Sequence, residues 1–301
     1  MSLPICLAVS AYRNDGAVVA LLEEHFDSWA GAVASIAVVD SGRQNSALET
    51  CLASRWPSVL YRHHRGNLGA AGNLKARFEL AAEVGAEYLF AINHDGSCEG
   101  EAVGALYQAA RSAEAEGQRV GAVYPLRLVQ GGAYDLTGTS RFVRPLKRSR
   151  VKPSRGRLKV YWSSSNGALY SVPAFESGVV PDADLWHGFE DLDYGWRLHA
   201  AGYEQLLSTA VTLEDPYEYT KSLGVRVADK PAWMSYYTVR NLLLATRRTR
   251  QPLPVATSAL ARLALECGTT ALLRKDKLKR FGYMAAGLVD AARNRGGRRW
   301  P

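Results

Sequence analysis

Short apolar stretches alternate with longer amphipathic ones over about the first 125 residues of the chain. The short stretches are rich in branched or aromatic residues and have the length of strands, at 5–10, 35–40, 59–63 and 88–93. The amphipathic stretches between them are typical of helices, at 16–29, 45–55, 68–84 and 99–116. This alternation predicts an α/β fold with a mixed, mostly parallel sheet and helices on both faces. Ligands bind such sheets beyond the carboxyl ends of the strands.

The pattern changes in the second half of the chain. Further strands are expected at 120–124, 158–162 and 168–172, and an irregular segment rich in Gly and Arg precedes the last two. From residue 231 the pattern is helical, with helices expected at 233–246, 256–273 and 275–294. We therefore predict two parts, an α/β domain over residues 1–225 and a helical, basic C-terminal region over residues 226–301.

The composition is that of a globular protein, since 47% of the 301 residues are hydrophobic. The four cysteines lie far apart without a CxxC pair, which argues against a zinc cluster or a disulfide framework and fits a reducing compartment. The N-terminus lacks a basic segment ahead of an apolar one, so no signal peptide is expected. The apolar stretch 254–273 contains Arg262 and Glu266, which argues against a membrane span. These features predict a cytoplasmic protein.

The net charge of +8 is unevenly distributed. Residues 141–159 hold nine Lys and Arg and no acid, and residues 274–301 hold nine with two acids, so the rest of the chain is net acidic. Two basic patches indicate an anionic partner such as lipid headgroups, phosphates or nucleic acid. We favour an anionic membrane surface, with the protein peripheral on the inner face of the plasma membrane. The alternative is ordinary solvated surface charge.

An unusual acidic cluster lies in the stretch from Trp186 to Arg197. Glu190, Asp191 and Asp193 occupy three of four successive positions among aromatic residues. Acids in such surroundings indicate a partly buried site, where burial raises a carboxyl pKa or requires a cationic partner. The alternative is a helix N-terminus whose acids complement the helix dipole, with Arg197 pairing with Asp193 at i,i+4.

Three further motifs follow strands of the first half. Asp40 ends a strand before Ser-Gly, and Asp95 follows Asn93-His94 at the end of another, before Gly. Asp95 in this position can hold Mg²⁺ or Mn²⁺ together with substrate phosphates, or it can form a turn. Asp40 can accept a hydrogen bond from a base or ribose, or it can cap a helix or a turn. The segment 65–73 carries glycines where a helix opens, which permits backbone N–H groups to approach an anionic ligand, or permits tight packing on the sheet.

In this order the motifs Val-Val-Asp-Ser-Gly, Asn-Leu-Gly-Ala-Ala-Gly-Asn, Asn-His-Asp and Glu-Asp-Leu-Asp-Tyr-Gly-Trp-Arg resemble those of the family 2 inverting glycosyltransferases. These enzymes have the GT-A fold and use nucleotide-sugar donors. The later Tyr-Tyr-Thr-Val-Arg-Asn at 236–241 is similar to a helix of the bacterial rhamnosyl- and galactofuranosyltransferase branches. The resemblance covers about residues 3–245. It implies a UDP- or dTDP-sugar donor and a glycan or polyprenyl-linked acceptor in cell-envelope polysaccharide synthesis, and no specific nucleic acid.

The resemblance also implies roles for individual residues of the chain. Asp191 would act as the base, with Glu190 beside it, and either of the two fits that role, although we prefer Asp191. Asp40 would contact the nucleobase. The other donor contacts would come from Asn67, Gly69, Asn73, Asn93, Asp95 and Arg197. On the acceptor side we expect His187 and Trp186.

A divalent metal, Mg²⁺ or Mn²⁺, is implied by the same resemblance. Asp95 corresponds to the last residue of the family's metal motif, whereas Asn93 stands where the family has its first acid. Many relatives have a further histidine ligand after the acid cluster, and here Glu214 and Asp215 occupy that stretch. We expect Asp95 and Glu214 as metal ligands, and the Asn93 substitution leaves the strictness of the metal dependence open.

Two other classes of function fit parts of the sequence. A non-catalytic module that binds nucleic acid or membranes on an α/β scaffold would account for the basic patches and predicts steeply salt-dependent binding. A nucleotidyltransferase would share the nucleotide pocket, but its triphosphate clamp needs a Lys- or Arg-rich glycine loop that we do not find in the sequence.

Overall fold

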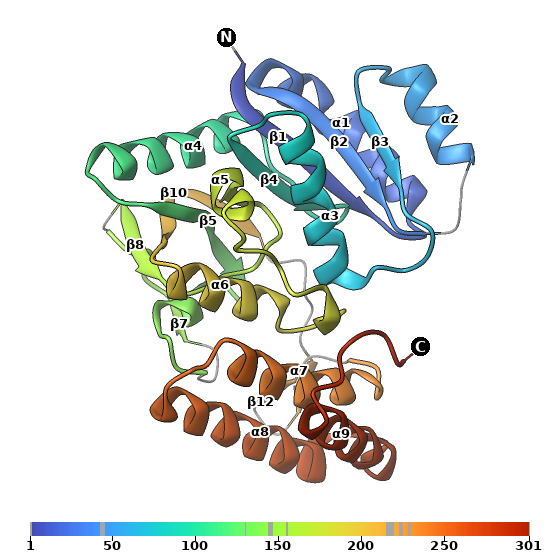
Figure 1. The fold of residues 1–301 in the computed structure, drawn as a ribbon, viewed down its shortest axis with the longest axis vertical. Helices are drawn as coiled ribbons and strands as arrows, with labels where there is room; N and C mark the ends of the chain where they lie inside the picture. Colours follow the sequence, from blue (N-terminus) through green and yellow to red (C-terminus); the bar gives the residue numbers. More distant parts are fainter. Residues whose placement is uncertain are drawn as a thin grey trace.

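The computed structural model describes residues 2–42, 46–129, 131–143, 147–154, 156–214, 220–222, 225–227 and 230–300. A twisted ten-stranded sheet forms its centre, in the order β3-β2-β1-β4-β9-β5-β10-β8, with β6 beside β5 and β7 beside β6 (Figure 1). The strands are β1 Leu3–Ala11, β2 Val33–Asp40, β3 Leu60–His63, β4 Tyr88–Asn93, β5 Val120–Val129, β6 Ala133–Asp135, β7 Arg148–Ser149, β8 Arg157–Val160, β9 Ala168–Ser171 and β10 Glu204–Glu214. A separate ribbon joins β11 Thr220–Ser222 to β12 Val225–Val227.

The sheet is mostly parallel along its main path. Parallel pairing joins β3, β2, β1 and β4, and β5 and β10 run in the same direction, whereas β9 and β8 run against them. β1 has buried side chains on both faces, as a central parallel strand does. Its apolar run from Ile5 to Val9 is therefore continuous instead of alternating. The predicted α/β class, with its mostly parallel sheet, is confirmed.

Two layers of helices cover the two faces of the sheet. α1 (Asp15–Ala32), α2 (Ser46–Arg55) and α4 (Gly100–Ala115) pack on one face with Ile5, Leu7 and Val9. α3 (Gly69–Glu83), α5 (Val172–Glu176) and α6 (Glu190–Ala200) pack on the other with Cys6 and Ala8. Successive residues of β1 thus enter opposite cores, because side chains alternate along a strand. Two short 3-10 turns, η1 (Thr137–Thr139) and η2 (Ala183–Leu185), complete this part of the chain.

The C-terminal helices lie together at one end of the molecule (Figure 1). They are α7 (Met234–Arg248), α8 (Leu253–Leu273) and α9 (Lys277–Ala292). Leu192 and Trp196 of α6 share a hydrophobic core with α7 and α8, so the helical region is packed directly on the α/β part. Among the described residues, no helix has both the length and the apolar character needed to cross a membrane.

Candidate active site

A cavity of about 620 Å³ opens at the carboxyl ends of β1, β2 and β4 and reaches the first turn of α6. This is the edge of the sheet where the sequence predicts ligand binding. Most of the expected site residues line it, although they come from segments far apart in the chain: Asn67, Gly69, Asn73, Asn93, Asp95, Trp186, His187, Glu190 and Asp191. Asp40, Arg197 and Glu214 are not among the lining residues.

Two half-buried carboxyls at the start of α6, Glu190 and Asp191, line this cavity. Burial, and then the neighbouring Glu190, raises the pKa of Asp191 to about 7. Burial also raises the pKa of Glu190. The backbone N–H of Ser165 donates to Asp191 Oδ1 at 3.2 Å, and Glu190 Oε2 has no hydrogen-bond partner among the described residues. A carboxyl with a pKa near neutrality is suited to accept a proton.

An unusual turn leads into this helix. Trp186 has φ 61° and ψ −59°, and the N–H of His187 donates to the carbonyl of Leu185 at 2.7 Å, which together form a γ-turn with a positive φ. Phe189 is also left-handed, with φ 65°. A non-glycine residue in these conformations is strained, and such strain persists only when surrounding contacts hold it. The turn places the Trp186 and His187 side chains against the cavity.

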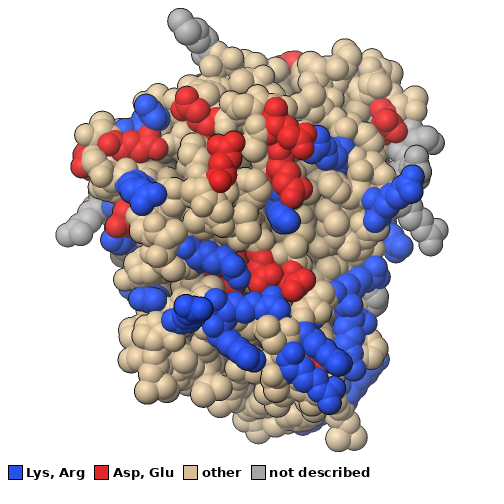
Figure 2. All heavy atoms as spheres, viewed as in Figure 1, with Lys and Arg blue, Asp and Glu red and all other residues tan. Residues whose placement is uncertain are grey.

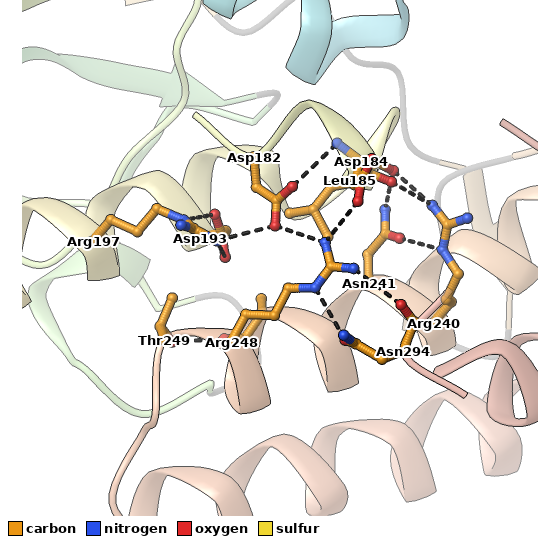
Figure 3. A network of polar contacts seen from close by, with 11 residues as sticks. Asp182, Asp184, Leu185, Asp193, Arg197, Arg240, Asn241, Arg248, Thr249 and Asn294 are labelled. Atoms are coloured by element: carbon orange, nitrogen blue, oxygen red, sulfur yellow. Dashed lines mark hydrogen bonds and ion pairs between the residues drawn. The ribbon is translucent and has the colours of Figure 1, made fainter. Parts of the chain in front are cut away.

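α7 supplies most of those contacts (Figure 3). Asn241 is fully buried, and its amide nitrogen lies 2.8 Å from the carbonyl oxygen of Leu185, 2.9 Å from that of His187 and 2.8 Å from that of Gly188. Arg240, equally buried, donates to the same Leu185 carbonyl at 2.9 Å. These two residues end the motif at 236–241, so the segment that resembles a family helix fixes the turn before the acid cluster.

The glycine segment holds the other side of the same turn. A Cβ on Gly69 would lie 2.2 Å from the Trp186 carbonyl oxygen, and Gly69 has φ +67°, so the position requires glycine. The N–H of Ala71 donates to the Trp186 carbonyl at 3.1 Å, and the Trp186 indole N–H donates to the Asn67 carbonyl at 3.3 Å. Gly69 therefore permits tight packing, the second of the two roles considered for segment 65–73, although it also lines the cavity.

The structure does not place Arg197 in the cavity. Its guanidinium lies 2.5 Å from Asp193 and 3.0 Å from Asp182, and Arg248 of α7 joins Asp182 at 2.8 Å (Figure 3). The expected donor contact is thus not seen, because the i,i+4 spacing directs Arg197 along α6 to Asp193. Burial raises the pKa of Asp193 to about 6. These ion pairs join α6 to α7 behind the site.

Asp40 and Glu214 also lie off the lining. Asp40 is buried, its Oδ1 accepts from the Gly42 N–H at 2.7 Å and its Oδ2 accepts from the Tyr61 hydroxyl at 3.0 Å, while the adjacent Ser41 lines the cavity. Glu214 is exposed at the end of β10. Its position gives no support to the expected metal contact, and Asp215 lies outside the described residues.

The site fits a metal held jointly by the protein and a ligand. Asp95 is exposed to the cavity, whereas the Asn93 side chain accepts from the Ser10 hydroxyl at 2.9 Å. No group of three or more His, Cys, Asp or Glu in the described part of the chain could hold a metal by itself. Mg²⁺ and Mn²⁺ commonly use one carboxylate with substrate phosphates, so Asp95 suffices for such an ion.

Several lining residues carry no signal in the sequence. Arg77 of α3 is buried beside the cavity, donates to the Ile92 carbonyl at 3.3 Å, and has its pKa lowered to about 10 by burial. Arg13, Trp233 and Arg298 also line the cavity. Trp233 packs near His187, with ring centroids 6.0 Å apart. A lone Arg or Trp in a helix or loop has no spacing that marks it, so only the folded chain reveals these residues.

Three solved structures share this architecture at low sequence identity. TarS 1–349 from S. aureus is 12% identical with a TM-score of 0.59 over 97% of this chain and 81% of that chain, and it is also known in complex with UDP-GlcNAc. The mannosyltransferase PcManGT from Pyrobaculum calidifontis, in complex with GDP-Man and Mn²⁺, is 13% identical with a TM-score of 0.57 over 98% and 88%. The fold is that of the GT-A glycosyltransferases.

A third structure, GalNAc-T7 with UDP, GalNAc and Mn²⁺, is 12% identical with a TM-score of 0.56 over 80% of this chain. The match covers 51% of the GalNAc-T7 chain, so this protein spans about half the length of that relative. No protein-family model and no curated protein sequence matches the chain. The likeness is therefore one of GT-A fold, and the cavity lies where that fold, as an open α/β sheet, binds ligands.

Proposed function

We propose that this protein is an inverting glycosyltransferase of family 2 that moves a sugar from UDP or dTDP to a hydroxyl of a glycan or lipid-linked acceptor in cell-envelope polysaccharide synthesis. One observation carries the proposal: a GT-A cavity at the strand ends holds a half-buried carboxyl, Asp191, whose pKa is raised to about 7 by desolvation. The neighbouring structures support a nucleotide-sugar donor, because their ligands are UDP, UDP-GlcNAc and GDP-Man.

In this proposal Asp191 removes the proton from the acceptor hydroxyl while that oxygen attacks the anomeric carbon. The bond from the anomeric carbon to the diphosphate oxygen breaks in the same displacement, which inverts the configuration. General-base catalysis of this kind contributes roughly 10²–10⁴-fold. The neighbouring Glu190 helps to keep the pKa of Asp191 high, and the Ser165 N–H fixes the orientation of the Asp191 carboxyl.

The donor would lie across the strand ends, with its diphosphate near Asp95. A divalent metal bound by Asp95 would supply neutralisation of the charge that develops on the departing diphosphate. Asn67, Asn73 and Asn93 contribute neutral polar groups to the same wall. The buried Asn73 Oδ1 has no partner among the described residues, which leaves it available to a donor group.

The acceptor side would be formed by the aromatic wall around the γ-turn. Trp186 and His187 line the cavity next to the acid pair, and Trp233 adds a third ring. Burial lowers the pKa of His187, which favours its neutral form and a role in contact with acceptor hydroxyls. Sugar rings present apolar C–H faces to such aromatic surfaces.

The first experiment is a thermal-shift panel of UDP, dTDP, GDP and CDP, each with and without Mn²⁺. Binding at about 100 times Kd stabilises a protein by roughly 2.7 kcal/mol, which gives a readable shift. We expect UDP or dTDP to stabilise most, and more so with Mn²⁺. The matching nucleotide sugar should then be consumed in an acceptor-dependent reaction that Asp191→Asn abolishes. No nucleotide response beside a clear response to RNA would instead support the polyanion-binding module.

A further inference from the structure

The outward face of α8 carries no charged side chain. Its exposed positions recur every three or four residues over the whole helix: Leu253, Pro254, Thr257, Leu260, Ala261, Ala264, Leu265, Gly268, Ala271 and Leu272. The two charged residues of the helix, Arg262 and Glu266, are half-buried at its side and lie 3.8 Å apart. The opposite face is apolar as well, since Val255, Ala259 and Leu263 belong to the core shared with α7.

α9 repeats this arrangement beside it. After its first turn the exposed positions are Phe281, Gly282, Ala285, Leu288, Val289 and Ala292, again without charge. α8 and α9 both pack against α7 and against each other, at the end of the molecule farthest from the sheet (Figure 1). Their outward faces, together with the exposed Leu278 in the first turn of α9, are taken as one surface, which we call the α8–α9 face.

Helices that are apolar on all sides are normally covered by protein or by lipid. The described residues leave this surface uncovered, since Leu272 is 77% exposed and Leu278, at the start of α9, is 90% exposed. A contiguous apolar surface of this kind marks an interaction site.

The charge around the face indicates what covers it. Lys275, Lys277 and Lys279 are exposed where α8 turns into α9, and Arg293 is exposed at the far end of α9. Figure 2 shows Lys and Arg gathered over the lower half of the molecule, where Figure 1 places the C-terminal helices. An apolar helical face flanked by basic residues fits the interface of an anionic bilayer, where leucines enter the acyl boundary and lysines meet the headgroups.

We propose that the α8–α9 face docks the protein on an anionic membrane. Docking on a membrane would deepen the proposed function, because it favours a lipid-linked acceptor. Only the identity of the acceptor rests on the proposed function; the docking itself does not. The tail after α9 connects the face to the cavity: the N–H of Gly297 donates to the Asp184 carbonyl, and Arg298 lines the cavity.

The test is flotation of the full chain with vesicles of phosphatidylcholine and with vesicles in which a third of the lipid is phosphatidylglycerol. The wild-type protein should bind the anionic vesicles, less at high salt, and bind the neutral ones far more weakly. Replacement of one deeply inserted leucine by glutamate should lower partitioning by about tenfold or more. Leu272→Glu/Leu278→Glu should then abolish flotation.

Leu60→Glu/Val84→Glu is the matched control. Leu60 is 37% exposed and Val84 41% exposed, and both lie outside the two basic segments. This variant introduces the same two charges on exposed apolar positions, and we expect it to leave flotation unchanged. An equal loss in Leu60→Glu/Val84→Glu, or equal binding to both kinds of vesicle, would overturn the proposal.

Two further readouts separate the outcomes. A dimer in solution that Leu272→Glu/Leu278→Glu converts to a monomer, without vesicle binding by the wild type, would make the face an interface between copies of the chain and overturn the proposal. The nucleotide thermal shift should be the same in this variant as in the wild type. Vesicle binding without any nucleotide response would contradict the proposed function and leave the docking proposal standing.

Discussion

Replacement of Asp191 by asparagine should remove activity and increase stability above neutral pH. The side chain keeps its shape, and its Oδ1 still accepts the Ser165 N–H, which lies at 3.2 Å from the carboxylate oxygen. The change removes only the buried charge and the proton-accepting capacity. A general base whose carboxyl is buried is costly to the fold, because the ionised form is desolvated.

The magnitude follows from the pKa of Asp191. Burial raises it to about 7, whereas an unfolded chain has an Asp pKa of about 3.9. Between these values the folded state binds more protons than the unfolded state, so its stability falls as pH rises and the full penalty is present above pH 7. A difference of about 3 units corresponds to a ceiling of about 4 kcal/mol. Asp191 lines the cavity, and water there reduces the penalty to about 2 kcal/mol.

The assay is thermal unfolding of the metal-free protein at pH 5 and pH 8. At pH 8 we expect Asp191→Asn to raise Tm by roughly 4 °C, and at pH 5 by much less. The control is Asp95→Asn, which removes a charge of the same sign from an exposed position at the same cavity and should leave Tm unchanged at both pH values. The kcat/KM of the wild type should rise with pH through about 7, since the base must be ionised.

Three results would refute this reasoning. They are an Asp191→Asn variant no more stable than the wild type at pH 8, a gain equal at both pH values, or retention of transferase activity. The first two would show that Asp191 is ionised without penalty. The third would move the base to Glu190, for which Glu190→Gln is the corresponding test.

The remaining predictions concern the metal, the glycine segment and the hydrogen bonds by which Asn241 holds the γ-turn. Asp95→Asn should abolish the part of the nucleotide thermal shift that depends on Mn²⁺ and leave the metal-free part unchanged. Gly69→Ala should destabilise more than Gly66→Ala by about 1 kcal/mol or more, because both have a positive φ but only the Gly69 Cβ would clash with Trp186; equal Tm losses would contradict the packing argument. Asn241→Asp should lower the free energy of unfolding by about 2–3 kcal/mol and reduce kcat, because it replaces a buried donor to three carbonyls by an acceptor. An unchanged Tm would show that Asn241 does not hold the γ-turn at Trp186.

The alternation of strands and helices in the first half of the chain was readable from the sequence. The stretches at 35–40 and 88–93 appear as β2 and β4, with boundaries within two residues. The strand-end motifs were placed at one edge of the sheet because parallel strands bring their carboxyl ends together, and Asn67, Asn93 and Asp95 line the cavity there. The short strands β6 and β7 had no comparable periodicity. The strand expected at 168–172 appears as β9, but its antiparallel insertion between β4 and β5 was not predicted.

The detailed site depends on contacts between distant segments. The γ-turn at Trp186 exists because Gly69, Ala71, Arg240 and Asn241 hold it from α3 and α7. Such a turn has no local sequence signature, because its strain is offset by partners from elsewhere in the chain. Arg197 is the opposite case, since its pairing with Asp193 at i,i+4 was one of the two alternatives that the sequence offered.

The sequence by itself determined the strands and helices of the first half of the chain and the three C-terminal helices, which edge of the sheet carries polar side chains, and which acids are candidates for chemistry. These follow from periodicity and from the direction of parallel strands, both of which are local properties. Tertiary structure alone decided that Arg77 and Arg298 reach the cavity, that Asp40 is buried outside its lining, and that the described residues leave one side of α8 uncovered. Apolar positions in a sequence indicate surface that tends to be buried, but only the packed chain shows which of that surface still lacks a partner.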